Sequence, residues 1–399
     1  MLNHCAEKEC ITPGRPAHKK PFRRGHISGL RRAQLDLDLH RFNQASCLMG
    51  SNTTEMATSA LTPGNSTVPD GGHNNCSSEA WEWLYTMQPV YMLVICVLGI
   101  AGNIFVLSVF CLHKKSCTVA EIYLSNLAIT DLVLVSCLPF WVCNVWNEFN
   151  WQFGPVMCRL VNVGIKMNMY CSIYSLVLVS FDRYMALVHT MSHGRMRRAS
   201  YAKLSCLAIW GLGILMSIPV FMFRKVEYIE EYDVSACILV YPRFEVEVAC
   251  DLLLITLGFL IPLSVISYCT CKIIQALRNQ DLNKFSMVRT EKKATFLVLF
   301  VLLAFMFCWI PFHLVTFIDV LVRVMDLNGC NLITGLEISN QVFTYLAFGN
   351  SVLNPILYVI VGKNFRKKVK EVFKRTDQKM KKITGSSHSN QSATLKTFI

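Results

Sequence analysis

The sequence predicts an all-α membrane protein, in which a bundle of seven transmembrane helices is followed by a short amphipathic eighth helix. Three observations support this fold class. The 399 residues are 53% hydrophobic and only 16% charged, which is too apolar for a water-soluble domain of this length. The apolar residues gather in seven runs of roughly 20 or more. The connections between these runs are short, which favours one bundle over several domains.

Each run is long enough to cross a bilayer core of about 30 Å at a helical rise of about 1.5 Å per residue. Backbone groups in lipid must form their hydrogen bonds within their own segment, so we expect helices. The runs lie near Val90–Leu112, Val119–Val145, Val156–Val188, Leu204–Phe223, Val246–Leu277, Ala294–Val324 and Ile338–Val361. We expect four regions: a glycosylated and largely disordered extracellular tail (1–88), the bundle (89–362), a basic amphipathic segment (363–382) and a Ser/Thr-rich cytoplasmic tail (383–399).

The net charge is +13, and its placement indicates how the chain is oriented. Basic residues cluster in alternate connections and after the last run, in segments 113–116, 189–203, 278–293 and 363–382. The connections on the other side, 144–154 and 224–243, are acidic or nearly neutral. The positive-inside rule therefore predicts a plasma-membrane protein with its amino terminus outside and its carboxyl terminus in the cytoplasm. This sidedness accounts for the basic excess, so we expect no nucleic-acid partner.

The amino-terminal tail is polar and lacks the apolar core of a cleavable signal peptide, so the first helix is expected to act as the signal. The tail carries three Asn-X-Ser/Thr acceptors for N-glycosylation, at Asn52, Asn65 and Asn75. Residues 1–48 are unusually basic for a translocated segment. Translation from Met49 or Met56 is therefore an alternative to a start at Met1.

The first three helices carry polar residues at marked positions. Asn103 lies in the first helix and Asp131 in the second, where a carboxylate is costly; it serves either a functional site or a hydrogen-bond hub. The third helix places Arg183 about 38 Å from Cys158, so Cys158 belongs at the extracellular face and Asp182-Arg183-Tyr184 at the cytoplasmic face. A membrane-edge anchor would explain a lone Asp-Arg-Tyr, but the polar and proline residues of the other helices favour a functional motif.

Two disulfides are predicted on the extracellular side, where the compartment is oxidising. The first joins Cys158 to Cys237 in the long extracellular loop. The second joins Cys76, before the first helix, to Cys330, between the sixth and seventh. Three other cysteines of the tail compete with Cys76 in principle: Cys5, Cys10 and Cys47.

Tryptophan, proline and polar residues also mark the later helices. A proline there bends its helix and permits a hinge. They are Trp210, Pro262, the Cys308-Trp309-Ile310-Pro311 sequence and the Asn354-Pro355-x-x-Tyr358 sequence. The segment Lys363–Lys374 spaces apolar residues along one face among basic ones, which predicts a short helix lying on anionic membrane lipid. The final Ser/Thr-rich tail is either a disordered linker or a phosphorylated docking segment.

From about Trp81 to Lys382 the chain resembles rhodopsin-class G-protein-coupled receptors, because the marked residues occur in order, one set per helix. Within that class it is similar to the bradykinin (kinin) receptors, the type 2 branch above all, in segments 103–113, 116–124, 316–321 and 358–363. The resemblance implies a receptor, not an enzyme, that transmits the binding of a short arginine-containing peptide to a heterotrimeric G protein, of the Gq class acting through phospholipase C. Receptor kinases and arrestin would act on the carboxyl-terminal tail.

The resemblance also implies roles for individual residues. The ligand's amino-terminal arginine would meet carboxylates at Asp319 and Glu337, although the family usually has aspartate where this chain has Glu337. Gln341 shares a helix face with Glu337. The apolar part of the pocket would be lined by Trp141, Trp309, Phe312 and Phe343. The acidic residues Glu227, Glu230, Glu231 and Asp233 would steer a cationic peptide inward.

The activation switch implied by the family lies below this pocket. Asp182 would pair with Arg183 at rest, and Glu291 would be a second partner of that arginine. The remaining switch residues are Tyr184, Ile173, Pro262, Phe305, Trp309, Asn354, Pro355 and Tyr358. No cofactor is expected apart from an allosteric sodium ion, for which water is the alternative, at Asp131, Ser172, Asn350 and Ser351 with Asn168. One departure is Thr270, which stands where the class usually has a tyrosine partner for Tyr358.

Other classes fit the sequence less well. A channel or transporter would show several intramembrane charges or repeated halves, whereas the main ones here are Asp131 and Lys166. A membrane enzyme would need paired catalytic carboxylates, a Ser–His–Asp set or a metal-spaced His–Cys cluster, and the runs contain none. A receptor for another peptide such as angiotensin, or one that scavenges peptide without signalling, stays open, although the intact Asp182-Arg183-Tyr184 disfavours the second.

Overall fold

The computed structural model describes residues 78–113, 117–188, 199–230, 233–279, 285–327 and 330–378. The helices in chain order are α2 (Ser78–Leu112), α3 (Val119–Trp146), α4 (Gly154–Leu187), α5 (Ala199–Phe223), α6 (Phe244–Ile255), η2 (Thr256–Leu260), α7 (Ile261–Asn279), α8 (Phe285–Val324) and α9 (Cys330–Ile360). The strands β1 (Arg224–Ile229) and β2 (Val234–Leu239) form an antiparallel hairpin between α5 and α6.

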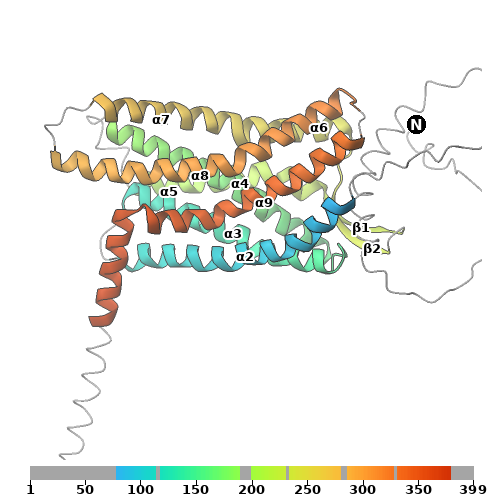
Figure 1. The fold of residues 1–399 in the computed structure, drawn as a ribbon, viewed down its shortest axis with the longest axis horizontal. Coiled ribbons are helices and arrows are strands. Elements are labelled where there is room, and N and C mark those ends of the chain that lie inside the picture. The colour runs from blue at the N-terminus through green and yellow to red at the C-terminus, as the bar shows by residue number, and fades with distance from the viewer. Residues whose placement is uncertain are drawn as a thin grey trace, which may run out of the picture.

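Seven helical segments in this described part are long and apolar enough to cross a membrane, which confirms the predicted fold class. One of them, Phe244–Ala276, runs continuously through α6, η2 and α7. Figure 1 shows the helices side by side, with the β-hairpin at the end of the bundle where α2 begins. Large apolar side chains such as Leu204, Leu303 and Phe307 are exposed on the outside, as expected for a surface that faces lipid.

Helix α4 lies at the centre of the bundle and packs against α3, α5 and α7. Two features hold the helices together here. The side chain of Asn126 on α3 donates to Ser175 Oγ (2.8 Å) on α4 and accepts from Trp210 Nε1 (2.9 Å) on α5. Gly213 on α5 lies so close to α4 that an added Cβ would be 2.6 Å from Cys171 Sγ. Polar bridges and small residues of this kind are typical of packed membrane helices.

The helix that contains α6 and α7 is interrupted by η2, one turn of π-helix. A π turn adds a residue to the turn and often occurs at functional positions. The ring of Phe259 in this turn stacks on His313 of α8, with centroids 4.5 Å apart. The turn therefore brings the fifth span against the sixth beside the centre of the bundle.

Residues 363–378 form the predicted eighth helix, which turns away from the bundle at the end opposite the hairpin (Figure 1). Phe365 is buried and its ring contacts those of Phe110 and Tyr358. Lys368 Nζ lies 2.7 Å from Glu121 Oε1, and His113 Nε2 lies 2.9 Å from a carboxylate oxygen of the same helix. The apolar face and the ion pairs together fix this helix to the ends of α2 and α3.

Candidate functional site

A cavity of about 190 Å³ lies in the half of the bundle nearest the hairpin. Its apolar wall is formed by Ile165, Met169, Val220, Trp309, Phe312 and Phe348, and its polar residues include Asn162, Lys166, Asn168, Arg224 and Thr344. These residues come from α4, α5, β1, α8 and α9, so the cavity exists only in the assembled bundle. An apolar cavity with a few polar groups is the usual form of a ligand site.

Two cations face this cavity, Lys166 on α4 and Arg224 at the start of β1. Arg224 is held in place, because its Nη2 donates to Asn162 Oδ1 (2.6 Å) and its guanidinium lies 5.8 Å from the ring of Trp141. The Cys158–Cys237 disulfide ties the hairpin to α4 beside it, which confirms the predicted first bridge. The positive charge suits a ligand group that carries a carboxylate.

The floor of the cavity is aromatic. The ring of Trp309 stacks on Phe305 (5.7 Å) and meets Phe312 edge-on (5.9 Å). Phe305 lies in the same buried cluster as Ile173 of α4. Within the described part of the chain, Trp309 Nε1 and both ring nitrogens of His313 are buried without a hydrogen-bond partner. Movement of Trp309 would therefore be transmitted directly to the packing beneath it.

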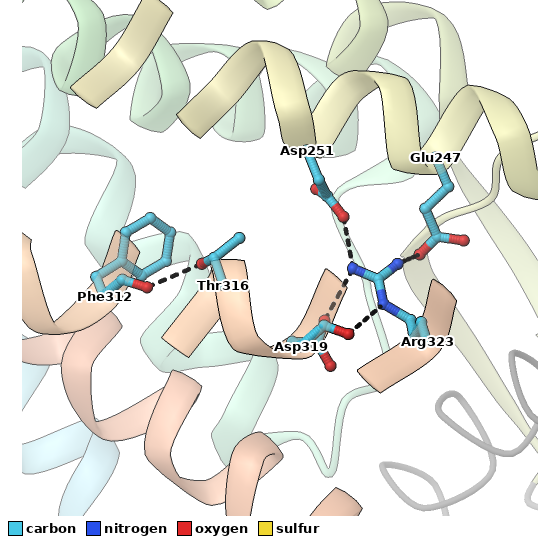
Figure 2. Close-up of polar contacts among 6 residues, drawn as sticks. All are labelled: Glu247, Asp251, Phe312, Thr316, Asp319 and Arg323. Carbon is cyan, nitrogen blue, oxygen red and sulfur yellow. Dashed lines mark hydrogen bonds and ion pairs between the residues drawn. The ribbon is translucent and has the colours of Figure 1, made fainter. Parts of the chain in front are cut away.

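Four charged residues form an ion cluster at the outer ends of α6 and α8 (Figure 2). Arg323 on α8 contacts Glu247 Oε1 (2.9 Å) and Asp251 Oδ2 (2.6 Å), both on α6, and Asp319 Oδ2 (2.8 Å) one turn back on its own helix. The four side chains are 16–29% exposed, so the cluster is half-buried. Asp319, expected from the sequence to meet a ligand arginine, is thus already paired with an arginine of the chain itself.

Of the other residues expected at the ligand site, two line the cavity and the rest lie elsewhere on α3 and α9. Among the described residues, Trp309 and Phe312 line it, whereas Trp141 contacts Trp151 and the cavity residue Arg224. Gln341 accepts a hydrogen bond from Tyr345 (3.0 Å) on α9. Glu337 and Phe343 are half-buried on the same helix.

A buried polar network lies below the cavity, around Asp131. Its carboxylate accepts from Asn168 Nδ2 (3.2 Å) and Asn354 Nδ2 (2.9 Å), which links α3, α4 and α9. Asn168 also donates to Ser172 Oγ (3.2 Å). The side-chain oxygens of Asn350 and Asn354 are buried with no hydrogen-bond partner among the described residues.

The end of the bundle opposite the hairpin contains the expected Asp182–Arg183 pair. Arg183 donates to Asp182 Oδ2 from Nη2 (2.5 Å) and Nε (3.1 Å), and both residues are buried. The ring of Tyr184 packs near that of Tyr268 on α7. Tyr358 Oη and Thr270 Oγ1 are buried and, in the described part, lack hydrogen-bond partners. Thr270, which stands where the class usually has a tyrosine, thus makes no hydrogen bond to Tyr358.

Several predicted sites lie outside what the structure describes. The glycosylation acceptors Asn52, Asn65 and Asn75 and the disulfide residue Cys76 belong to the undescribed tail. The side chains of Cys330 and Glu291 are likewise not described. These predictions stay as predictions.

The sequence patterns missed two features of the site. Lys166 was recognised as an intramembrane charge but not as part of a cavity, because its neighbour Arg224 comes from a loop whose path was unknown. Arg323 was overlooked, although it follows Asp319 by four residues, a spacing that pairs side chains on one helix face. Glu247 and Asp251 are also four residues apart, so they lie on one face of α6 and can bind a common cation.

Comparison with known proteins agrees with this geometry. Residues 102–358 match the model of the 7 transmembrane receptor (rhodopsin family). The chain is 51% identical over 318 residues to the B2 bradykinin receptor of Sus scrofa, which covers 79% of this chain and 86% of that receptor. It is 51% identical to the B2 bradykinin receptor of Homo sapiens over 309 residues (77% and 79% of the two chains) and 39% identical to the human B1 bradykinin receptor over 335 residues (84% and 94%). The chain therefore belongs to the rhodopsin family of seven-transmembrane receptors and, within it, to the bradykinin receptors.

Proposed function

We propose that this receptor binds a short peptide of the bradykinin type from the extracellular side and transmits that binding to a heterotrimeric G protein. Its family consists of signalling receptors of the plasma membrane rather than enzymes. One observation carries the proposal: the cations Lys166 and Arg224 line the cavity, and a cluster of carboxylates lies beyond its lining, at the outer ends of α6 and α8. A peptide with a cationic amino end and a free carboxylate matches both levels.

In this arrangement the amino-terminal arginine of the peptide meets Asp319 and Glu337. An arginine–carboxylate contact is charge-assisted and often bidentate, which makes it strong and directional. The peptide's carboxylate meets Lys166 and Arg224, which are already held in the cavity wall. Exposed acidic residues of the hairpin, Glu227 and Glu230, attract the cationic peptide at longer range.

The apolar middle of the peptide would press on the aromatic floor at Trp309. A ligand that contacts this residue differently in two conformations shifts the balance between them. We propose that the shift swings the cytoplasmic half of α8 outward about Pro311 and separates Glu291 from Arg183. The cavity opened in this way would receive the G protein.

We also propose that a sodium ion binds beside Asp131. The set of oxygen ligands fits a hard cation, since the carboxylate of Asp131 is buried and the side-chain oxygen of Asn350 is buried without a partner among the described residues. The residues that would hold the ion are Asp131, Ser172, Asn350 and Ser351, with Asn168. The ion would neutralise the carboxylate inside the bundle, and ordered water is the competing occupant.

Further parts of the proposal concern the cytoplasmic side. The basic loops support a carboxyl terminus in the cytoplasm and a glycosylated amino-terminal tail outside. The apolar face of residues 363–378 packs on the bundle, which leaves the exposed side chains of Lys363, Lys367 and Lys370 to meet anionic lipid. We propose Gq as the G-protein class, with receptor kinases and arrestin acting on the Ser/Thr-rich tail.

The proposal is tested by exposing cells that express the receptor to a panel of kinins and angiotensins and measuring calcium release. We expect kinins alone to give a response. Asp319→Ala should lower kinin potency about 10- to 100-fold, since a hydrogen bond to a charged group contributes about 1.5–3 kcal/mol. Glu245→Ala, which removes an exposed carboxylate from the first turn of α6, is the matched control and should have little effect.

Unchanged potency of Asp319→Ala at equal surface expression would refute the ligand assignment. Nucleotide exchange on purified G protein separates a signalling receptor from one that only scavenges peptide. The carboxylate end is tested separately with an amidated peptide. Amidation should weaken binding to the wild type, and Lys166→Gln should reduce that difference.

A further inference from the structure

We infer that Arg323 is a built-in competitor for the ligand's amino-terminal guanidinium and so determines how strongly the receptor selects a cationic peptide end. The inference rests on the proposed function, because it concerns the carboxylate of Asp319 that the peptide would meet. It arises from the ion cluster at the outer ends of α6 and α8 (Figure 2), in which the chain's own arginine occupies that carboxylate.

The contacts of Arg323 show that the occupancy is specific. Its Nη2 lies 2.8 Å from Asp319 Oδ2 and 2.6 Å from Asp251 Oδ2, so one nitrogen bridges α8 and α6. Its Nη1 donates to Glu247 Oε1 (2.9 Å). The guanidinium side chain is only 21% exposed. An external arginine therefore reaches Asp319 either by sharing it with Arg323 or by displacing that contact.

When the peptide's guanidinium binds Asp319, the other carboxylates of the cluster favour a shift of Arg323 toward them over its release into solvent. Three carboxylates surround the guanidinium of Arg323, so it keeps two carboxylate partners when one of them is taken. When the peptide's guanidinium takes Asp319, Arg323 keeps Glu247 and Asp251, which lie one turn apart on α6. The exchange replaces one charge-assisted contact of Asp319 with another, and its cost is the loss of the contact between Asp319 and Arg323. A peptide with a neutral first residue cannot make this exchange.

This competition lowers the apparent affinity for a cationic peptide by the fraction of receptors in which Asp319 is free. Replacing Arg323 with a residue that lacks a guanidinium should therefore strengthen the binding of a cationic peptide. The binding of a peptide whose first side chain is neutral should stay unchanged. A merely structural role of Arg323 predicts the opposite, since the loss of a half-buried ion pair would weaken the binding of both peptides.

The experiment measures the affinities of bradykinin and of an analogue with citrulline in place of its first arginine, on membranes with equal surface expression. For Arg323→Gln we expect about a tenfold gain for bradykinin and less than a twofold change for the citrulline analogue. Arg323→Lys keeps the charge and is the variant safest for folding. It loses the fork that bridges both helices, so we expect about a threefold gain for bradykinin.

Two controls separate competition from a general change of electrostatic field. Arg243→Gln removes an exposed positive charge at the start of α6 and should alter bradykinin affinity less than about twofold. In a double-mutant cycle, Arg323→Gln should give no gain once Asp319 is replaced by asparagine. A gain that persists without the Asp319 carboxylate, or an equal change for both peptides, would overturn the inference. Failure of the wild type to bind bradykinin at all would instead overturn the proposed function, and the inference with it.

Discussion

The packing of α5 against α4 can be tested with one added methyl group. In Gly213→Ala the new Cβ would lie 2.6 Å from Cys171 Sγ, about 1 Å inside ordinary contact. Cys171 is fully buried, so its sulfur has little room to move. Overpacking of this kind costs about 1–3 kcal/mol, and alanine recovers up to about 1 kcal/mol of it through helix propensity.

Gly211→Ala is the matched control, because it lies two residues away on the same helix with nothing within 4 Å of an added Cβ. Both variants make the same glycine-to-alanine change in α5. The difference between them therefore isolates the clash, and we expect Gly213→Ala to be less stable by about 2 kcal/mol.

The assay is thermal unfolding of the purified receptor in detergent, with the Tm of each variant compared with the wild type. Adding Cys171→Ala to Gly213→Ala removes the sulfur that the new Cβ meets. The Tm of this double variant should lie closer to the Tm of Gly211→Ala than the Tm of Gly213→Ala does. Equal Tm values for the two single variants, or no narrowing in the double variant, would refute the packing argument.

Three further predictions follow from the polar contacts. Asn126→Ala should destabilise the receptor by about 2 kcal/mol in the same assay, because it leaves the half-buried indole N–H of Trp210 without its acceptor and Ser175 without its donor. Replacing sodium with an organic cation should raise agonist affinity of the wild type severalfold in a binding assay, and Asp131→Asn should abolish this response; an equal response in both would contradict the proposed sodium site. Lys368→Gln, which breaks the 2.7 Å pair with Glu121, should speed amide hydrogen exchange across residues 363–378 about fivefold while the spanning helices keep their protection.

The features of the fold that depend on apolar length were predictable from sequence. Runs such as Val119–Val145 mark their spans closely, because lipid requires an unbroken apolar helix whatever it packs against. The Cys158–Cys237 bridge was also predictable, since the charge pattern of the connections assigns both cysteines to one side of the membrane. The hairpin that includes Cys237 was not, because β1 is a short polar segment without the alternation of a buried strand.

The contacts between distant residues were the least predictable part of the candidate site. Arg323 and Glu247 are 76 positions apart, and their pairing depends on how each helix is rotated about its axis. Hydrophobic periodicity reports which face of a helix avoids lipid, but it does not identify the partner of a charged side chain. The contact between Asp319 and Arg323 is an exception, because a four-residue spacing on one helix makes it predictable.

The π turn at Thr256–Leu260 has a consequence for how the charge of the outer surface depends on chain length. A π turn holds one residue more than an α turn, so a one-residue deletion inside it is absorbed by a change to an α turn, and α6 keeps its orientation. The same deletion within α7 would rotate everything beyond it by about 100°, and Glu247 and Asp251 would no longer face Arg323. The π turn therefore determines where along this span a change of length leaves the ion cluster intact.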